Sequence, residues 1–560
     1  EVAELPAMQP PDQMLPIGFQ RRFLLLPPSL AAVTGQPIGS RRLQVKPPPI
    51  GDLGNIRASI EELTTRMVGQ NDCRWLEQIR ILEHQTDGGI LHSFDIESIS
   101  GPVVTAWQGR FRNRSTLTFR WQTAGWKRSG GAMSWSDETS RGFFALEALG
   151  RQWADPESTE NSRPTRRFRM LRYSPVAETA GKVPIERVDI RTSQVGESLV
   201  PDFDSNLIKR REMAVAREID EVPREESVRW LDSQGDNVRQ IRADGQVEVH
   251  LPDDSQSPAF LSPPGGAAVL IRGKAPPVSG TPLLALKIRF YPAPVQNEDD
   301  KPDASASEED AVADTDAEVS PVDTLLSAPG QWVIKQGDTW RVLLLGDGVT
   351  AGELVRDFRG YRSEILERDT LPTELANFDD RALTDYKTLI NFLLKSRSDA
   401  AEMEAAKNRD YASLLISNVM RLVEPADAPR MVGDAASIAK ENFGDPVGRA
   451  LLATAILRSR GIPTRLALGL RLDPNWQAAR APAWMHFDAW PIVWVDSQWV
   501  PMDLSDEALE SRDLFNIHAT RLTLGIPELR ALDVQRSLQS CFETMQRLQI
   551  EVSGWRRQMD

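Results

Sequence analysis

The chain has 560 residues, a formal net charge of -14, and a composition of 41% hydrophobic and 26% charged residues. This length exceeds what one hydrophobic core usually serves, so several domains are expected. The longest apolar stretches, such as residues 23–33, are interrupted by prolines, and no segment is expected to span a bilayer as a helix. No basic patch with interleaved aromatic residues is present, which argues against a nucleic-acid partner.

Residues 1–55 are rich in proline and show little periodicity, so they are expected to form an extended arm. The next segment, 56–89, carries Ile56, Ile60, Leu63 and Met67 at helical spacing, with a break at residues 69–72. This pattern predicts a segment of two helices.

Alternating apolar and polar residues dominate the segment 90–292. Leu117 and Phe119 alternate with Thr118, and a similar alternation runs through residues 284–290. Such alternation is typical of half-buried antiparallel strands, and glycine-rich turns separate the runs. The segment is therefore predicted to form one or two β-rich domains of the β-sandwich kind, with a hairpin over residues 230–241.

The acidic surplus of the chain is concentrated in one segment. Ten acidic residues lie between Glu298 and Glu318, against the single Lys301. Residues 293–330 hold few apolar side chains that would offset the entropy of ordering the backbone. They are predicted to be a disordered, solvated linker rather than an acidic binding site.

Residues 331–560 are predicted to form the last domain. Helical patterns cover residues 386–394, 411–423, 435–443 and 447–460, strands are expected over 340–345, 466–470, 485–495 and 498–502, and a closing helix over 534–550. Helices that lead into antiparallel strands indicate an α+β arrangement. The predicted fold class is thus α+β, with β-rich N-terminal domains followed by a helix-plus-antiparallel-sheet domain.

Five short motifs follow one another in the last domain. They are Gly444-Asp445-Pro446, the helix 447–460, Gly461-Ile462-Pro463-Thr464-Arg465, Asp488-Ala489-Trp490 and Trp499-Val500-Pro501-Met502-Asp503. In kind and order they resemble the transglutaminase-like superfamily, whose core is similar to that of papain-type cysteine proteases. The resemblance covers about residues 430–520. It implies a large bacterial multidomain protein and favours an extracytoplasmic compartment, although no targeting segment is present in the given chain.

The resemblance also assigns catalytic roles to three positions. The nucleophilic cysteine of the family falls on Pro446, the general-base histidine falls on Asp488, and the acid that orients the histidine is retained as Asp503. Proline has neither a thiol nor the backbone N–H that would hold an oxyanion. It is suited to the first position of a helix capped by Asp445. The resemblance therefore implies a triad that lacks its nucleophile and its general base.

Other residues near these positions leave alternatives open. His486 shares a strand face with Asp488, and with Asp488 and Asp503 it offers a set of divalent-ion ligands, although a hydrogen-bonded core histidine is the preferred interpretation. Trp484, Trp490 and Trp499, with His486, are candidates to line a peptide-binding cleft, and core packing is the alternative for the tryptophans.

The two cysteines of the chain, Cys73 and Cys541, lie outside these motifs. Neither has a CxxC partner or a histidine at metal-ligand spacing, so no zinc and no other cofactor is expected. Two buried free thiols are preferred over one long-range disulfide.

Two functions remain to be compared. The first is a catalytically inactive transglutaminase-like protein that binds another protein or peptide or supports assembly. The alternative is an active hydrolase or amide-transfer enzyme with a relocated or cysteine-independent site in the same cleft. A hydroxyl or thiol within about 3.5 Å of an imidazole, with a third group behind it, would favour the alternative.

Overall fold

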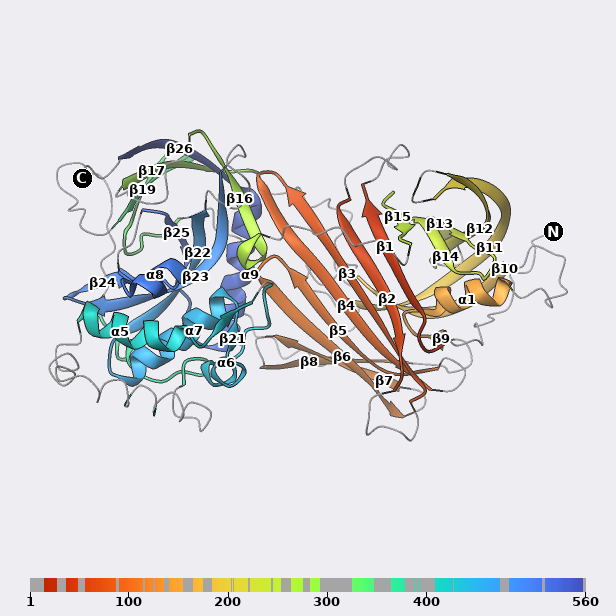
Figure 1. The fold of residues 1–560 in the computed structure, drawn as a ribbon, viewed down its shortest axis with the longest axis horizontal. Coiled ribbons are helices and arrows are strands. Elements are labelled where there is room, and N and C mark those ends of the chain that lie inside the picture. Colours follow the sequence, from red (N-terminus) through yellow and green to blue (C-terminus); the bar gives the residue numbers. More distant parts are fainter. Residues whose placement is uncertain are drawn as a thin grey trace, which may run out of the picture. The chain divides into compact units, whose positions relative to one another are not determined.

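The computed structural model places its elements in two compact units (Figure 1). The first comprises Glu1–Val68, Leu76–Ser100 and Val104–Leu261, and the second comprises Gly69–Trp75, Gly101–Val103 and Ser262–Asp560. No helix within the described part of the chain is long and apolar enough to cross a membrane. The structure describes residues 15–27, 37–48, 56–86, 90–113, 116–123, 126–134, 140–154, 165–174, 184–202, 204, 206–219, 222–242, 245–252, 263–274, 283–292, 325–346, 364–377, 388, 391, 408–426, 428–473, 483–515 and 519–556.

The first unit is built from antiparallel strand pairs. Its elements are β1 (Gln20–Leu26), β2 (Gly39–Lys46), β3 (Ala58–Gln70), β4 (Cys73–Gln85), β5 (Leu91–Ser100), β6 (Val103–Asn113), β7 (Thr116–Thr123), β8 (Trp126–Ser134), β9 (Ser140–Arg141), α1 (Ala145–Ala154), β10 (Thr165–Tyr173), β11 (Ile185–Pro201), β12 (Leu207–Ile219), β13 (Val222–Leu231), β14 (Asn237–Ile241) and β15 (Val247–His250). Hydrogen-bonded neighbours run in the order β3, β2, β1, β15, β14, β13, β12, β11, β10. The β-rich prediction and the hairpin over 230–241 are confirmed.

A buried guanidinium connects several elements of this unit. Arg41 of β2 contacts Glu62 of β3 at 2.6 Å, Glu147 of α1 at 2.9 Å and Glu248 of β15 at 3.0 Å. Burial alone would lower the pKa of Arg41, but the three carboxylates raise it well above its usual value. Because breaking a buried ion pair leaves an uncompensated charge, this cluster constrains how α1 and the three strands pack.

The prediction of an extended arm over residues 1–55 is wrong where the structure describes them. β1 pairs with both β2 and β15, and Phe23 and Leu25 are fully buried. The prolines at 27–28 and 47–49 follow the ends of β1 and β2, which accords with their inability to donate hydrogen bonds to a sheet. β1 forms because Leu24 to Leu26 gain burial between β2, which is close in the sequence, and β15, which is more than 200 residues away.

The prediction of two helices over 56–89 is also wrong, since this segment forms strands β3 and β4. The break at 69–72 is a two-residue turn, and Asn71 has a φ of 55°, which such tight hairpin turns require. Glu61, which a strand pattern would place outside, is buried because Lys46 and Arg80 bind its carboxylate. Pairing with β2 and the cross-strand ion pairs outweighed the helical spacing of the apolar residues.

The second unit contains the predicted α+β arrangement. Its elements are β16 (Ala267–Arg272), β17 (Leu283–Phe290), β18 (Gln331–Gln336), β19 (Thr339–Leu345), α5 (Arg409–Met420), β20 (Glu424–Pro425), α6 (Ala435–Glu441), β21 (Phe443–Gly444), α7 (Pro446–Ser459), β22 (Thr464–Asp473), β23 (Trp484–Val495), β24 (Gln498–Pro501), α8 (Asp506–Ser511), β25 (Arg521–Gly525), α9 (Ala531–Arg547) and β26 (Leu548–Arg556). One sheet runs β24, β23, β22 and β25, and β16 pairs with β23 on the same edge as β24, opposite β22. A second group pairs β18, β19, β17 and β26.

Helix α7 is the central helix of this unit. It packs against β22 and β23 and against helices α5 and α6, and most of its residues from Val447 to Leu457 are buried. An all-round apolar surface of this kind is expected of a helix that is enclosed on every side. The predicted helices 411–423, 435–443 and 447–460 are confirmed within a few residues, whereas the predicted helix 386–394 lies largely outside the described residues.

Two boundaries differ from the sequence analysis. The second unit begins at Ser262, so β16 and β17 belong with the C-terminal domain rather than with the β-rich segment that was expected to end at 292. The closing helix ends at Arg547, and residues 548–556 form β26, which pairs with β17. Most of the predicted acidic linker, residues 293–324, lies outside the described residues.

Glu83 of β4 is a fully buried carboxyl group in the first unit. It accepts hydrogen bonds from the Phe143 backbone N–H at 2.6 Å and from Gln85 at 2.7 Å. Burial raises its pKa to about 7, and the hydrogen bonds only partly oppose that rise.

The raised pKa of Glu83 makes the stability of the unit dependent on pH. The folded chain binds this proton more tightly than the unfolded chain, so stability falls as pH rises from about 4.5 to 7. Glu83→Gln should remove this contribution, and urea unfolding at pH 4 and pH 8 should show that the parent loses about 3 kcal/mol relative to the variant over that interval. Parallel curves for the two proteins would contradict the assignment.

Candidate functional site

The first residue of α7 occupies the position where the family resemblance places a nucleophile. Pro446 is the first helical residue, and Asp445 is the N-cap, whose carboxylate accepts the Gly448 N–H at 2.8 Å and the Arg430 N–H at 3.0 Å. Burial raises the pKa of Asp445, and the two N–H groups partly oppose that effect. The predicted capped helix start is therefore present in the structure.

The pairing of β22 with β23 sets the position of Asp488. In this register Gly469 lies opposite Asp488 and Arg471 lies opposite His486, so their side chains share one face of the sheet. A side chain at position 469 would collide with the backbone oxygen of Leu522 and the ring of Trp490, so only glycine fits there. The register consequently brings a long cationic side chain, Arg471, next to Asp488.

Arg471 contacts the two aspartates that the resemblance placed in the triad. Its Nε atom lies 3.3 Å from Asp488, and its Nη1 atom lies 3.9 Å from Asp503. Asp503 is also bound by Arg521 at 2.6 Å and by the Ser505 N–H at 2.8 Å. Burial alone would raise the pKa of Asp503, but the two guanidinium groups hold it well below its usual range. The retained acid thus has arginine partners.

Arg449 adds a third guanidinium to this cluster. It lies one turn after Pro446 on α7 and its side chain is 12% exposed, with the exposed Asp506 at 3.6 Å. Burial lowers the pKa of Arg449, while the charges of Asp506 and Asp488 oppose the change. The Nε atoms of Arg449 and Arg521 are buried and have no hydrogen-bond acceptor among the described residues. Two donors are therefore left for an acceptor group.

The arginine of the Gly-Ile-Pro-x-Arg motif has a separate task. Arg465 forms two hydrogen bonds to Asp369, at 3.0 and 2.7 Å, and its guanidinium stacks on Trp499 at 4.3 Å from the ring centroid. Arg458 of α7 donates to the backbone oxygen of Thr464 at 2.7 Å. These contacts fix the turn between α7 and β22, so the motif is explained by structure alone.

The four residues expected to line a cleft lie in the core. His486 and Trp490 are 2% and 1% exposed, and Trp484 and Trp499 are at most 9% exposed. Trp490 and Trp499 belong to one hydrophobic cluster with Ile492. The cleft assignment is therefore wrong for these side chains, because strand residues of this face are covered by aromatic and apolar neighbours. Core packing, the alternative for the tryptophans, is what the structure has.

The structure describes the environments of the two cysteines and of the candidate metal ligands Asp488 and Asp503. Cys73 and Cys541 are free and buried, and burial raises the pKa of each thiol to about 12. A thiol of this kind is a poor nucleophile at neutral pH. No group of three potential ligands is gathered within the described residues, and Asp488 and Asp503 are bound by arginines instead.

The sequence analysis did not identify Arg449, Arg471 or Arg521. These residues come from α7, β22 and β25, and they meet only after the sheet is assembled. The available signal was Arg471, which lies two residues after Gly469 on a strand with otherwise apolar neighbours. A charge on the buried face of a central strand indicates an oppositely charged partner.

A comparison with models of known protein families finds a match in the region that contains α7. Residues 397–504 match the family model described as the transglutaminase-like superfamily. None of the curated proteins compared with the chain matches it.

Three solved structures are similar to parts of the chain. A β-barrel-like protein of a domain of unknown function from Brucella abortus matches at 10% identity and a TM-score of 0.29, over 42% of this chain and 95% of that one. A provisionally assigned cysteine protease from Cytophaga hutchinsonii matches at 14% identity and a TM-score of 0.22, over 38% of this chain and 60% of that one. A provisionally assigned protease from Parabacteroides distasonis matches at 12% identity and a TM-score of 0.18, over 74% and 64% of the two chains. All three TM-scores lie below 0.5, so the family model carries the assignment.

The cap of α7 gives a testable stability prediction. Asp445→Ala should lower the free energy of unfolding by about 1–2 kcal/mol, because a buried N–H group and a partly buried one lose their acceptor. The matched control is Asp434→Ala, which removes the cap of α6 at a bond to one N–H. Urea unfolding should show the larger loss for Asp445→Ala. An equal or smaller loss would mean that the buried cap is not important for α7.

The arginine partners of Asp503 give a prediction about pH. Asp503→Asn should destabilise the chain by about 3 kcal/mol at pH 7, because two arginines lose a buried counter-charge. The contribution of a carboxylate with a lowered pKa is present above about pH 4 and is lost as pH falls below it. The difference in thermal unfolding between parent and variant should therefore persist down to about pH 4 and shrink progressively as pH falls from about 4 to about 2. A difference that stays constant over this range would argue against the ion pairs.

Proposed function

Because residues 397–504 of this chain form a transglutaminase-like domain, we propose that the protein is a catalytically inactive member of that superfamily and that it works by binding another protein or a peptide. The observation that supports this most strongly is the arginine network at the position of the triad. Asp488, where the family chemistry would need an imidazole, contacts Arg471, and the retained acid Asp503 contacts Arg521.

Loss of catalysis is favoured by two features of the helix start. Pro446 offers no thiol, and its backbone nitrogen carries no hydrogen to hold an oxyanion. The surrounding contacts suit the proline, since Asp445 caps the helix by accepting the Gly448 N–H, and the first helical position has no need of an N–H. According to this proposal, the position of the family nucleophile now serves as a stable start of helix α7.

A binding function is supported by hydrogen-bond donors of Arg449 and Arg521 that have no acceptor among the described residues. Arg471 is 29% exposed and Arg449 is 12% exposed, and the buried Nε atoms of Arg449 and Arg521 have no acceptor among the described residues. Unsatisfied buried donors are uncommon in proteins, and their acceptor is a water, an ion or a bound partner. Carbonyl or carboxylate oxygens of a bound polypeptide are suitable acceptors for guanidinium groups.

The alternative of a relocated catalytic site has one candidate among the residues that the structure describes. Ser59 Oγ lies 2.8 Å from His84 Nδ1 in the first unit, which satisfies the distance expected of a nucleophile and its base. Ser59 is only 4% exposed, and the two residues lie on the successive strands β3 and β4. A cross-strand pair buried in a sheet is closed to a substrate, so we retain the inactive assignment.

An activity assay separates the two functions. The purified chain should show no amine incorporation into protein and no amide hydrolysis above background. Turnover that persists in Pro446→Ala would identify a site that is independent of this position and would overturn the proposal. Ser59→Ala then serves as the control, since loss of that turnover would place the activity at Ser59 and His84.

A second experiment tests whether the frame of the site is preserved. Pro446→Cys places a thiol at the N-terminus of α7, where the helix dipole favours a thiolate. Adding Asp488→His supplies an imidazole and should increase the rate of alkylation at pH 7 by at least a few-fold. Asp506→His, which adds a histidine on the exposed first turn of α8, is the matched control and should give no increase. An equal rate for the double variant and Pro446→Cys alone would show that position 488 is too far from position 446.

A further inference from the structure

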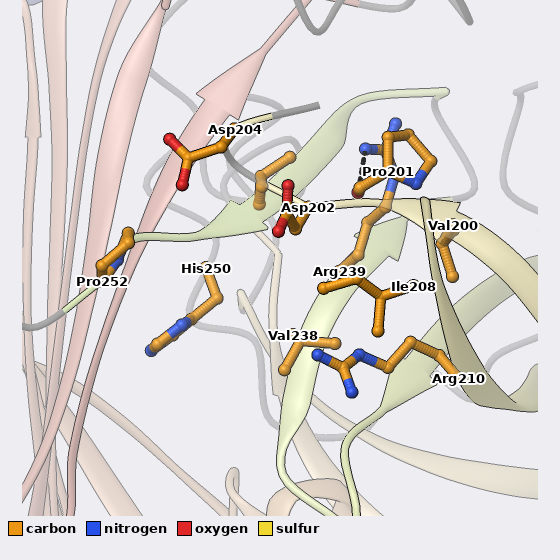
Figure 2. A pocket seen from close by; sticks show the side chains of 11 residues that line it. Val200, Pro201, Asp202, Asp204, Ile208, Arg210, Val238, Arg239, His250 and Pro252 are labelled. Atoms are coloured by element: carbon orange, nitrogen blue, oxygen red, sulfur yellow. Dashed lines mark hydrogen bonds between the residues drawn. The ribbon is translucent and has the colours of Figure 1, made fainter. Parts of the chain in front are cut away.

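The first unit contains a small pocket at the end of the β11–β12 hairpin, lined also by residues of β14 and β15 (Figure 2). Its volume is about 120 Å³. A cavity needs only about 10–15 Å³ of this volume to hold one water, so the pocket can take a compact molecule such as a small α-amino acid. It lies in the first unit and is therefore a different site from the one proposed for the transglutaminase-like domain, which belongs to the second unit.

Charged side chains of both signs line this pocket. Arg210 and Arg239 supply guanidinium groups, and Asp202 and Asp204 supply carboxylates. Figure 2 shows Asp202 and Asp204 toward the top of the view and the guanidinium of Arg210 toward the bottom. The structure forms no ion pair between the two arginines and the two aspartates, all four of which it describes.

The arginines have unused hydrogen-bonding capacity. Arg210 has neither a hydrogen bond nor an ion pair with any residue in the described part of the chain. Arg239 is 5% exposed, and its single partner among the described residues is the backbone oxygen of Pro201 at 3.1 Å. Burial lowers the pKa of Arg239, with no carboxylate close enough to oppose it. A buried guanidinium without a counter-charge is unfavourable unless an anion accompanies it.

The carboxylates of Asp202 and Asp204 are likewise not paired with these two arginines. Asp202 accepts hydrogen bonds from the backbone and side chain of Asn206, at 2.8 and 3.4 Å, which fix its place in the loop without neutralising its charge. Asp204 is exposed at the mouth of the pocket. Each carboxylate oxygen can accept more than one hydrogen bond, so Asp202 retains acceptors for a cationic donor.

We propose that this pocket binds a small zwitterion, with its carboxylate or phosphate on Arg210 and its ammonium group on Asp202 and Asp204; Figure 2 shows the guanidinium of Arg239 beside Pro201, on the opposite side of the view from that of Arg210. Both sets of charges are held on the same pocket without pairing, so a ligand that carries both signs would neutralise both at once. A simple anion would leave the aspartates uncompensated, and a simple cation would leave Arg210 uncompensated. The proposal is independent of the function assigned to the transglutaminase-like domain.

The test uses the full chain and three probes of similar size. L-alanine carries both charges, propionate lacks the ammonium group, and ethylamine lacks the carboxylate. Calorimetric titration should show binding of L-alanine at least about tenfold tighter than of either half-ligand, since each charged hydrogen bond contributes about that factor. O-phosphoethanolamine tests the phosphate form, and sedimentation with phosphatidylethanolamine vesicles tells a lipid headgroup from a free ligand.

Matched variants locate the site. Arg210→Gln and Asp202→Asn should each weaken binding of the preferred zwitterion at least about tenfold. Lys209→Gln and Glu197→Gln are the controls, because these substitutions make the same charge changes as the two test variants. Lys209 and Glu197 belong to the same hairpin and pair with each other on its exposed surface. Thermal unfolding checks that all four variants are folded.

The proposal is overturned by either of two results. One is the absence of binding for L-alanine, O-phosphoethanolamine and the vesicles at ligand concentrations up to about 10 mM, a range that covers even weak affinities. The other is binding that Arg210→Gln and Asp202→Asn weaken no more than the two control variants do.

Discussion

The register between β22 and β23 is the constraint on which the candidate site depends. Ten residue pairs hold it, and a shift by one residue would turn Asp488 and Arg471 to the opposite face of the sheet. Gly469 supports this register because only glycine can approach Leu522 and Trp490 so closely. The position of Asp488 is thus fixed by backbone pairing, and its partner Arg471 follows from the same pairing.

Buried charges organise both units in a similar way. In the first unit, Arg41 joins three glutamates from different elements, and in the second, Arg521 and Arg471 join Asp503 and Asp488. Each set is stable only when every member is present, because a lone buried charge is costly. In the second unit this arrangement occupies the place where the family would need a reactive imidazole. The ion pairs that stabilise the fold thus occupy a position that catalysis would need, which supports the proposed binding function.

The C-terminal domain was predictable because its signals are local. The helix of α7 has a capping aspartate followed by proline, and the strands after Arg465 alternate or run continuously apolar. The segment 56–85 was not predictable in this way. Its apolar residues have helical spacing, but strand pairing with β2 and the turn at Asn71 decided its structure. The same holds for β1, whose partners β2 and β15 are close and very distant in the sequence, respectively.

The sequence by itself determined that positions 446 and 488 lack a thiol and an imidazole, and that Asp445 and Pro446 begin a helix. These features depend on residue identity and on contacts within one turn. Only the tertiary structure decided that Trp484, His486, Trp490 and Trp499 are buried, and that Arg449, Arg471 and Arg521 surround the two aspartates. These ion pairs join residues up to 57 positions apart, Arg449 and Asp506, and such contacts exist only once the sheet has assembled.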